Sequence, residues 1–213
     1  IDSGDNVYIS AMLRDRPGYN RVQKFDSHGN YLEEWTIMAN HMAFDSNDNL
    51  FATSNYYYVH KYDQNMDLVG QWTEGDEGDP FVVTFGIAVD SEDNVYVSDY
   101  EADKILKFTN DGEFITEWGS EGTGEGRFNY PLGVAIDKDD KVYISDTYNN
   151  RLQVFSKDGE YITSGLIPGT SLRGIEVDNS TGYVYVGEYY GSPYIMGWAI
   201  DAPLTGLTCG TTY

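Results

Sequence analysis

The chain lacks the residues that would build a disulfide framework or a histidine-rich metal centre. Its 213 residues include one cysteine, Cys209, so no disulfide can form within the chain. Histidine occurs three times, and no apolar run reaches the length of a membrane span. No phosphate-binding glycine loop, nucleophile elbow or HExxH motif is present. We therefore expect a protein that is not a catalyst and does not insert into a membrane.

Positive charge is also scarce. Thirteen Lys and Arg residues stand against 35 Asp and Glu residues, which gives a formal net charge of −22. The long-range field of such a chain repels a phosphate backbone or an anionic membrane surface, which argues against nucleic acid as a partner. The charge suits an exposed protein that meets cations or basic surfaces, and we expect an extracellular or cell-surface location. The sequence opens at Ile1 within a strand pattern, so we expect a processed product or a fragment.

Tyrosine, by contrast, is abundant, and one strand motif recurs five times. Its copies begin at Val7, Leu50, Val95, Val142 and Val184, separated by 43, 45, 47 and 42 residues. Each unit has an apolar strand such as GIAVD, an Asp-rich turn, an alternating strand such as VYVSD, and two more strands joined by a turn. Four short antiparallel strands at this period predict an all-β fold in which each unit is one blade of a β-propeller.

The third and fourth units resemble NHL repeats. The resemblance rests on GVAIDKDDKVYISDTYNNRLQVFSKDGEYITSG and on the preceding segment EWGSEGTGEGRFNYPLGVAID. NHL propellers usually have six blades, whereas five units are visible here and the first keeps only the end of its innermost strand. We expect five or six blades, closed through residues 201–213 or through a neighbouring chain. The single domain 1–213 divides into blades at roughly 1–37, 38–82, 83–129, 130–169 and 170–213.

The resemblance also indicates where a ligand would bind. In such propellers the innermost strands line a central channel. The loops that follow the second and fourth strands gather on one face, which we call the upper face, and loops on a rigid scaffold commonly carry function. The candidate ligand-binding residues at the channel or on this face are His41, Asp99, Tyr100, Arg127, Asp146, Tyr148, Arg173, Glu188 and Tyr189.

Tyrosines in these loops favour a binding surface, since each offers contact area and a hydroxyl group. Tyr19, Tyr130 and Tyr190 occupy upper-face loops together with the tyrosines already named. Such a surface suits a glycan or a peptide, and we expect a protein or glycan ligand, with self-association as a further partner.

Three carboxylates, those of Asp99, Asp146 and Glu188, occupy the same position in successive blades. Converging carboxylates are suitable ligands for Ca²⁺, the one cofactor that the sequence suggests. Alternatively, each carboxylate caps its own loop by accepting backbone N–H bonds. Position in the repeat is sufficient to explain capping, so we favour that interpretation.

His41 replaces the glycine that other units carry on their innermost strand, which places an imidazole at the channel. The NHL resemblance includes an amidating lyase whose zinc is held by several channel histidines. Here His28 lies in an outer turn and His60 on a third strand, so we do not expect the three to meet at one metal. His41 is expected to be a packed or hydrogen-bonded residue.

These observations favour a non-catalytic NHL-type propeller that binds a protein or glycan or takes part in assembly. One alternative is a metal-dependent lyase or hydrolase acting at the central channel, with His41 and the three carboxylates. The other is a structural subunit of a surface lattice or filament, in which another chain completes the first blade.

Overall fold

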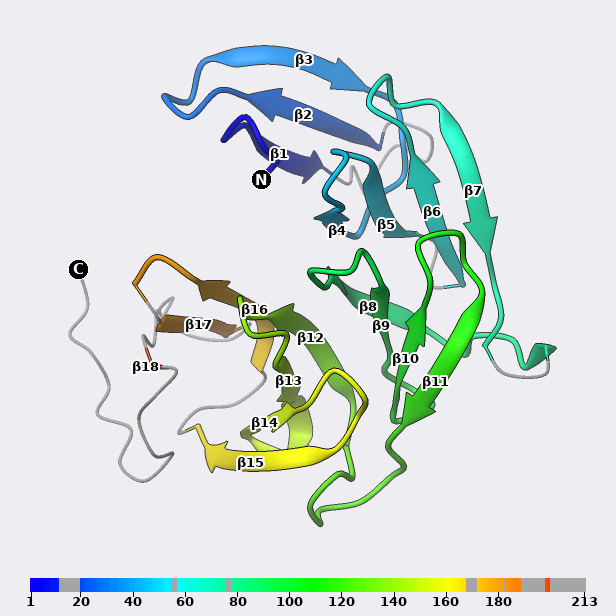
Figure 1. Ribbon diagram of the computed structural model, residues 1–213, viewed down its shortest axis with the longest axis vertical. Coiled ribbons are helices and arrows are strands. Elements are labelled where there is room, and N and C mark those ends of the chain that lie inside the picture. Colours follow the sequence, from blue (N-terminus) through cyan, green and yellow to red (C-terminus); the bar gives the residue numbers. More distant parts are fainter. Residues whose placement is uncertain are drawn as a thin grey trace.

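The chain folds into antiparallel sheets arranged around a common axis (Figure 1). The computed structural model describes residues 1–11, 20–54, 57–75, 78–167, 172–181, 183–188 and 198–199. Within these residues the 3₁₀ turn η2 (Thr147–Asn149) follows β13 (Val142–Asp146) on the chain, and no helix is long and apolar enough to cross a bilayer. The prediction of a β-propeller is confirmed.

Five sheets, which we call blades I to V, follow one another along the chain. Blade I contains β1 (Val7–Ala11), β2 (Arg21–Phe25) and β3 (Tyr31–Trp35), and blade II contains β4 (His41–Phe44), β5 (Leu50–Ser54), β6 (Tyr58–Tyr62) and β7 (Leu68–Trp72). Blade III contains β8 (Thr84–Val89), β9 (Val95–Asp99), β10 (Lys104–Phe108) and β11 (Phe114–Trp118). Blade IV contains β12 (Pro131–Ile136), β13 (Val142–Asp146), β14 (Arg151–Phe155) and β15 (Tyr161–Leu166), and blade V contains β16 (Leu172–Asp178), β17 (Tyr183–Glu188) and β18 (Trp198–Ala199).

The apolar core lies between neighbouring blades. One cluster joins Phe51 and Val59 of blade II to Val95 and Val97 of blade III, and similar clusters join each other pair of successive blades. Every residue of β5, β9 and β13 is buried, because each of these second strands has a sheet packed on both faces. The Val-Tyr-Val alternation of the sequence therefore fills two interfaces at once, one on each side of the blade.

Asp-rich turns end the innermost strands on the face opposite the upper face. The carboxylate of Asp90 accepts the backbone N–H of Glu92 at 3.0 Å and that of Asn94 at 2.8 Å, as expected of a turn held by a local Asp side chain. The same turns also join blades, since Ser91 donates its backbone N–H and its hydroxyl to the carboxylate of Asp140 in the next blade, at 3.0 and 2.8 Å. Ser3–Asp48 and Ser46–Asp93 repeat this clasp.

Tryptophans at the ends of the fourth strands also link neighbouring blades. Trp118 of blade III packs on the turn of blade IV, where Gly159 adopts a φ of +84°. A Cβ at Gly159 would lie 2.8 Å from the indole ring, so the turn requires glycine both for its backbone and for its close approach to the ring. Trp72 packs in the same way on Gly112 of blade III.

Among the described residues, no strand pairing joins blade I to blade V (Figure 1). Among the described residues nothing pairs with the inner edge of β1, and Val7 and Ile9 are 38% and 49% exposed, whereas their equivalents on β5, β9 and β13 are fully buried. A Cβ at Gly86 would lie 2.4 Å from the Leu132 carbonyl oxygen of the next innermost strand. Gly174, at the equivalent position on β16, has nothing within 4 Å.

Candidate functional site

A row of aromatic rings crosses the upper face from the central channel to blade IV. The ring centroids of Tyr100 and Tyr130 are 5.7 Å apart, and those of Tyr130 and Tyr148 are 4.8 Å apart. Toward the axis, Phe85 lies 5.9 Å from Tyr100 and 4.2 Å from the ring of His41. Tyr130 is 37% exposed and Tyr148 is 61% exposed. We call Tyr100, Tyr130 and Tyr148 the tyrosine row.

The backbone of each tyrosine is fixed by a hydrogen bond to another loop. Tyr100 donates its N–H to the carbonyl of Val83 at 2.9 Å, and Tyr148 donates its N–H to the carbonyl of Asn129 at 3.0 Å. Tyr148 lies in η2, directly after β13, and Tyr130 directly precedes β12. The exposed rings therefore project from a backbone that the scaffold holds in place, which lowers the conformational entropy that binding would cost.

Tyr130 has an unusual backbone conformation for a bulky residue. Its φ of +55° lies in the left-handed region, where a side chain is disfavoured. Its N–H is held by the carboxylate of Asp103 at 2.8 Å, across 27 residues of sequence. Backbone strain of this kind persists only where the surroundings impose it, and it is common at binding sites.

The Asp103 carboxyl lies among other acidic groups beneath the tyrosine row. Burial raises its pKa, and the negative charges of Glu121, Asp146 and Asp99 raise it further, although the bond from Tyr130 opposes this. Each of these charges disfavours an additional negative charge nearby. The protein therefore sets a negative electrostatic potential at the base of the row.

The inner end of the row reaches the central channel. A cavity of about 120 Å³ there is lined by His41, Arg173 and Glu176 among others. Burial, together with the positive charge of Arg173, lowers the pKa of His41 to about 4, so the imidazole is neutral at neutral pH. Partial burial raises the pKa of Glu176, although its side chain also contacts solvent. Small-molecule sites usually measure about 300–1,000 Å³, so this cavity is too small for one.

Asp99 is buried at the end of β9 and binds its own loop. Its two carboxylate oxygens accept the backbone N–H groups of Val82 at 2.6 Å and Val83 at 2.8 Å. It also lines a hollow of about 320 Å³, whose lining includes the ion pair of Lys104 and Glu117. The carboxylate is thus engaged as a loop cap, in the manner that the repeat position favours.

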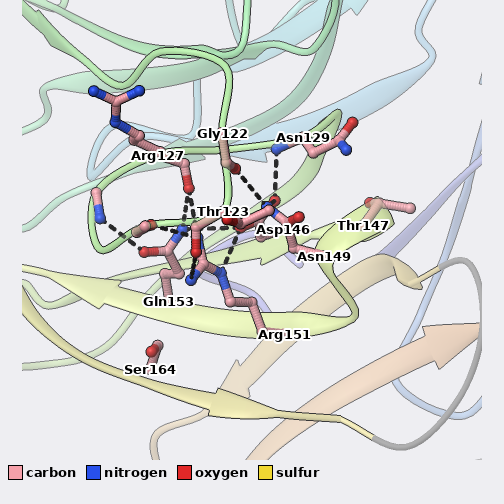
Figure 2. A network of polar contacts seen from close by, with 12 residues as sticks. Gly122, Thr123, Arg127, Asn129, Asp146, Thr147, Asn149, Arg151, Gln153 and Ser164 are labelled. Carbon is pink, nitrogen blue, oxygen red and sulfur yellow. Dashed lines mark hydrogen bonds and ion pairs between the residues drawn. The ribbon is translucent and has the colours of Figure 1, made fainter.

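Asp146 is the centre of the polar network in Figure 2. It is fully buried and accepts hydrogen bonds from the N–H of Asn129 at 2.8 Å, from Arg151 Nε at 2.7 Å and from Gln153 Nε2 at 2.9 Å. Arg151 also donates to the carbonyls of Thr123, Gly124 and Arg127. The network fastens the loop before β12 to β13 and β14, and so positions the segment that carries Tyr130.

The remaining candidates lie in separate places. Arg127 contributes its backbone carbonyl to the Asp146 network, while its side chain is exposed. The backbone of Glu188 pairs with Leu172 at the end of blade V, but its side chain and the whole of Tyr189 are outside the described residues. Within the described part, no group of three or more His, Cys, Asp or Glu residues is arranged to hold a metal ion.

The histidines do not fit a lyase-type zinc site, in which several channel histidines would hold the metal. His60 bonds to Ser54 at 3.0 Å and to Gln71 at 2.9 Å within blade II, and the ring of His28 lies beside Ser27 in an exposed turn. The ring of His41 packs against Phe85 at the channel, with the two ring planes tilted by 43°. Because a zinc site needs several converging imidazoles or thiolates, we derive no metal chemistry from these residues.

Sequence reasoning missed the aromatic residue that joins the tyrosine row to the channel. Phe85 precedes Gly86 on an innermost strand, so its position predicts a channel-lining side chain rather than one that bridges His41 and Tyr100. The useful signal was the aromatic residue at this position, where the next blade carries Leu132. Tyr130 was recognisable as an upper-face tyrosine, but its left-handed backbone was not.

Comparison with known proteins supports the fold. Residues 128–155 match the model of the NHL repeat, and no curated protein sequence matches the chain. A catalytically inactive virginiamycin B lyase from Staphylococcus aureus, solved with quinupristin, superposes with a TM-score of 0.57 at 15% identity, over 96% of this chain and 73% of that one.

Two further structures are similar. A Bacteroides caccae protein of unknown function gives a TM-score of 0.56 at 11% identity, over 80% of this chain and 62% of the other. Hydrazine synthase from Kuenenia stuttgartiensis gives 0.57 at 19% identity, over 70% of this chain and 42% of the other. At such low identity the likeness concerns the fold alone. Together with the matched repeat, it shows that the chain is a β-propeller that contains an NHL repeat.

Proposed function

We propose that this propeller is a non-catalytic binding module, at the cell surface or outside the cell, and that the tyrosine row is its binding surface. The observation that carries the proposal is the continuous line of rings from Tyr100 through Tyr130 to Tyr148, with centroid separations of 5.7 and 4.8 Å. Tyrosine combines a rigid apolar face with a hydroxyl, so it gains much contact area for little lost side-chain entropy.

The shape of the row suits an elongated ligand. Its members come from three loops, and Tyr130 contacts both Tyr100 and Tyr148, so a chain-like peptide or glycan could meet them one after another. The outer member is the most exposed, and the backbone of each is fixed before any ligand arrives. Preorganised aromatic residues are common where a few side chains supply most of the binding energy.

A test uses peptide and glycan arrays probed with the natural chain and with Tyr148→Ala. Tyr31, which is 54% exposed on the outer strand β3, provides the matched control Tyr31→Ala. We expect ligands whose binding falls at least tenfold with Tyr148→Ala and is unchanged with Tyr31→Ala, while both variants keep the unfolding temperature of the natural chain. Ligands that bind all three proteins equally would contradict the proposal.

The open edge of blade I supports assembly as a second candidate function. Val7 and Ile9 leave apolar surface on β1, whose inner edge has no partner among the described residues, and exposed strand edges readily accept another strand. In this alternative, a strand of another chain lies between β1 and β16. Light scattering across a range of concentrations tests it: oligomers that dissociate with Ile9→Lys would support it, and a stable monomer at every concentration would exclude it.

A further inference from the structure

The tyrosine row lies in a strongly acidic setting. The whole chain carries a formal charge of −22, and Asp99, Asp103 and Glu121 are close enough for their charges to interact near the row. Glu101 is exposed in the same loop as Tyr100. A ligand that lies along the row therefore enters a negative field, which favours cations and repels anions.

The positive charge of Arg151, the arginine closest in sequence to Tyr148, is already compensated. Arg151 Nε binds the Asp146 carboxylate at 2.7 Å, and its other nitrogens bind backbone carbonyls of the preceding loop. Arg173 lies at the opposite end, in the channel beside His41. The loop before Tyr130 exposes Arg127 but also Glu121 and Glu125, so its own charge remains negative. The acidic field and the exposed rings therefore coincide at the outer half of the row, formed by Tyr130 and Tyr148.

Aromatic faces attract cations when the charged group lies within about 6 Å of the ring centroid. This protein uses that contact repeatedly in its interior, where Lys107 Nζ lies 4.9 Å from the centroid of Tyr96 and Lys24 Nζ lies 5.2 Å from that of Tyr8. Each of these lysines also interacts with an aspartate, Asp90 and Asp2 respectively. In both places the chain therefore holds a lysine ammonium group against a tyrosine ring and beside a carboxylate.

We propose that the ligand of the tyrosine row is a basic peptide segment of a partner protein, whose arginine or lysine side chains lie against the rings of Tyr130 and Tyr148. The inference rests on the proposed function, because it assigns a chemical class to the ligand of the same surface. It commits to a cationic peptide rather than a glycan on the ground of charge complementarity. Among the described residues, no lysine or arginine lies over the ring of Tyr130 or Tyr148, in contrast to Tyr8 and Tyr96.

Calorimetric titration of the full chain tests the proposal. The probes are short synthetic peptides of equal length in which glycine alternates with arginine, with glutamine or with glutamate. We expect the arginine peptide to bind at least tenfold more tightly than the glutamine peptide, and the glutamate peptide to show no binding. Raising the salt concentration should weaken the binding of the arginine peptide, since screening reduces attraction between partly exposed charges.

Variants separate a contact with the row from general attraction to an acidic protein. Tyr148→Leu keeps an apolar side chain but removes the aromatic face, and we expect it to weaken the affinity for the arginine peptide about fivefold. Tyr148→Phe keeps the face, and Tyr31→Leu removes an exposed ring elsewhere, so both should bind as the natural chain does. If Tyr31→Leu and Tyr148→Leu bind alike, the attraction is diffuse and the proposal is wrong.

The remaining outcomes distinguish a failure of this inference from a failure of the proposed binding function. If a neutral glycan or the glutamine peptide binds as tightly as the arginine peptide and depends on Tyr148, the row is a binding surface but its ligand is not basic. That result would overturn the inference and leave the proposed function standing. If nothing on the arrays depends on Tyr148 and the arginine peptide does not bind, both fail together.

Discussion

The ring of Tyr148 lies 4.8 Å from the ring of Tyr130, and the two tyrosines come from different loops of blade IV. Tyr148 follows β13, whereas Tyr130 precedes β12 and has a left-handed backbone. The bond from the Tyr148 N–H to the Asn129 carbonyl and the Asp146 network hold these loops together. The exposed end of the row is thus positioned by buried polar contacts rather than by the rings themselves.

Replacing Tyr130 should separate stability from binding. Glycine adopts a φ of +55° without steric cost, so Tyr130→Gly relieves strain while it removes the ring. We expect the free energy of unfolding to stay within about 1 kcal/mol of the natural value while ligand binding falls at least tenfold. Urea unfolding and array binding measure the two effects. A loss of several kcal/mol would show that the ring mainly stabilises the fold.

Two equivalent glycines should respond differently to alanine. Gly86→Ala places a Cβ 2.4 Å from a backbone carbonyl of blade IV, and we expect a loss of about 2 kcal/mol or more. Gly174→Ala meets nothing within 4 Å and should change stability by less than about 0.5 kcal/mol. Equal losses in chemical unfolding would mean that an innermost strand closes the ring beside β16 in solution.

The clasp between Ser91 and Asp140 should contribute to the stability of the junction between blades III and IV. Ser91→Ala removes the 2.8 Å hydroxyl bond but leaves the backbone N–H bond of 3.0 Å, so we expect it to cost about 1 kcal/mol. Asp140→Ala removes both bonds and should cost more. A double-mutant cycle measures the coupling, and independent, additive effects would show that the clasp is energetically silent.

His41 should make stability depend on pH in mildly acidic solution. Its pKa is about 4 in the folded chain and 6.5 as the ordinary value, so the fold favours the neutral ring. As the pH falls from 6.5 to 4, the unfolded chain takes up a proton that the folded chain does not, and stability is lost. The charged groups at the cavity are Arg173, which opposes the imidazolium, and Glu176, which would favour it.

We expect the natural chain to lose about 1–3 kcal/mol more than His41→Gln over this pH range. Aspartates such as Asp45 and Asp90, whose pKa values are lowered in the fold, also lose their stabilising contribution at lower pH. That loss is the same in both proteins and cancels in the comparison. The pKa of His41 is also directly accessible from the ring resonances. A value near 6.5, or identical pH profiles for the two proteins, would refute the burial of a neutral imidazole.

Much of the fold could be predicted because the information is local and repeated. The motif KVYISD marks β13 almost to the residue, and the Lys-Asp-Gly turn after Phe155 carries Gly159 in its left-handed conformation. The second strands β5, β9 and β13 are short, largely apolar runs bounded by turn residues, a pattern consistent with strands that are buried on both faces. The order of strands within a blade follows from the same repeat, so five copies reinforce one interpretation.

The site was less predictable because it depends on contacts between distant residues. Asp103 fixes Tyr130 across 27 residues, and Ser91 binds Asp140 across 49. Neither pair has a local pattern that distinguishes it from an ordinary turn. Asp146 could be assigned as a loop cap, but its bonds to Arg151 and Gln153 depend on the register of β13 with β14.

The most direct test of the tyrosine row is a map of chemical-shift changes as a ligand identified on the arrays is titrated into the isotopically labelled chain. The account predicts that the largest changes occur at the rings and amides of Tyr100, Tyr130 and Tyr148, with little change at the Asp-rich turns of the opposite face or along β1. If the largest changes lie on β1 or on the opposite face while the row is unperturbed, the tyrosine row is not the binding surface.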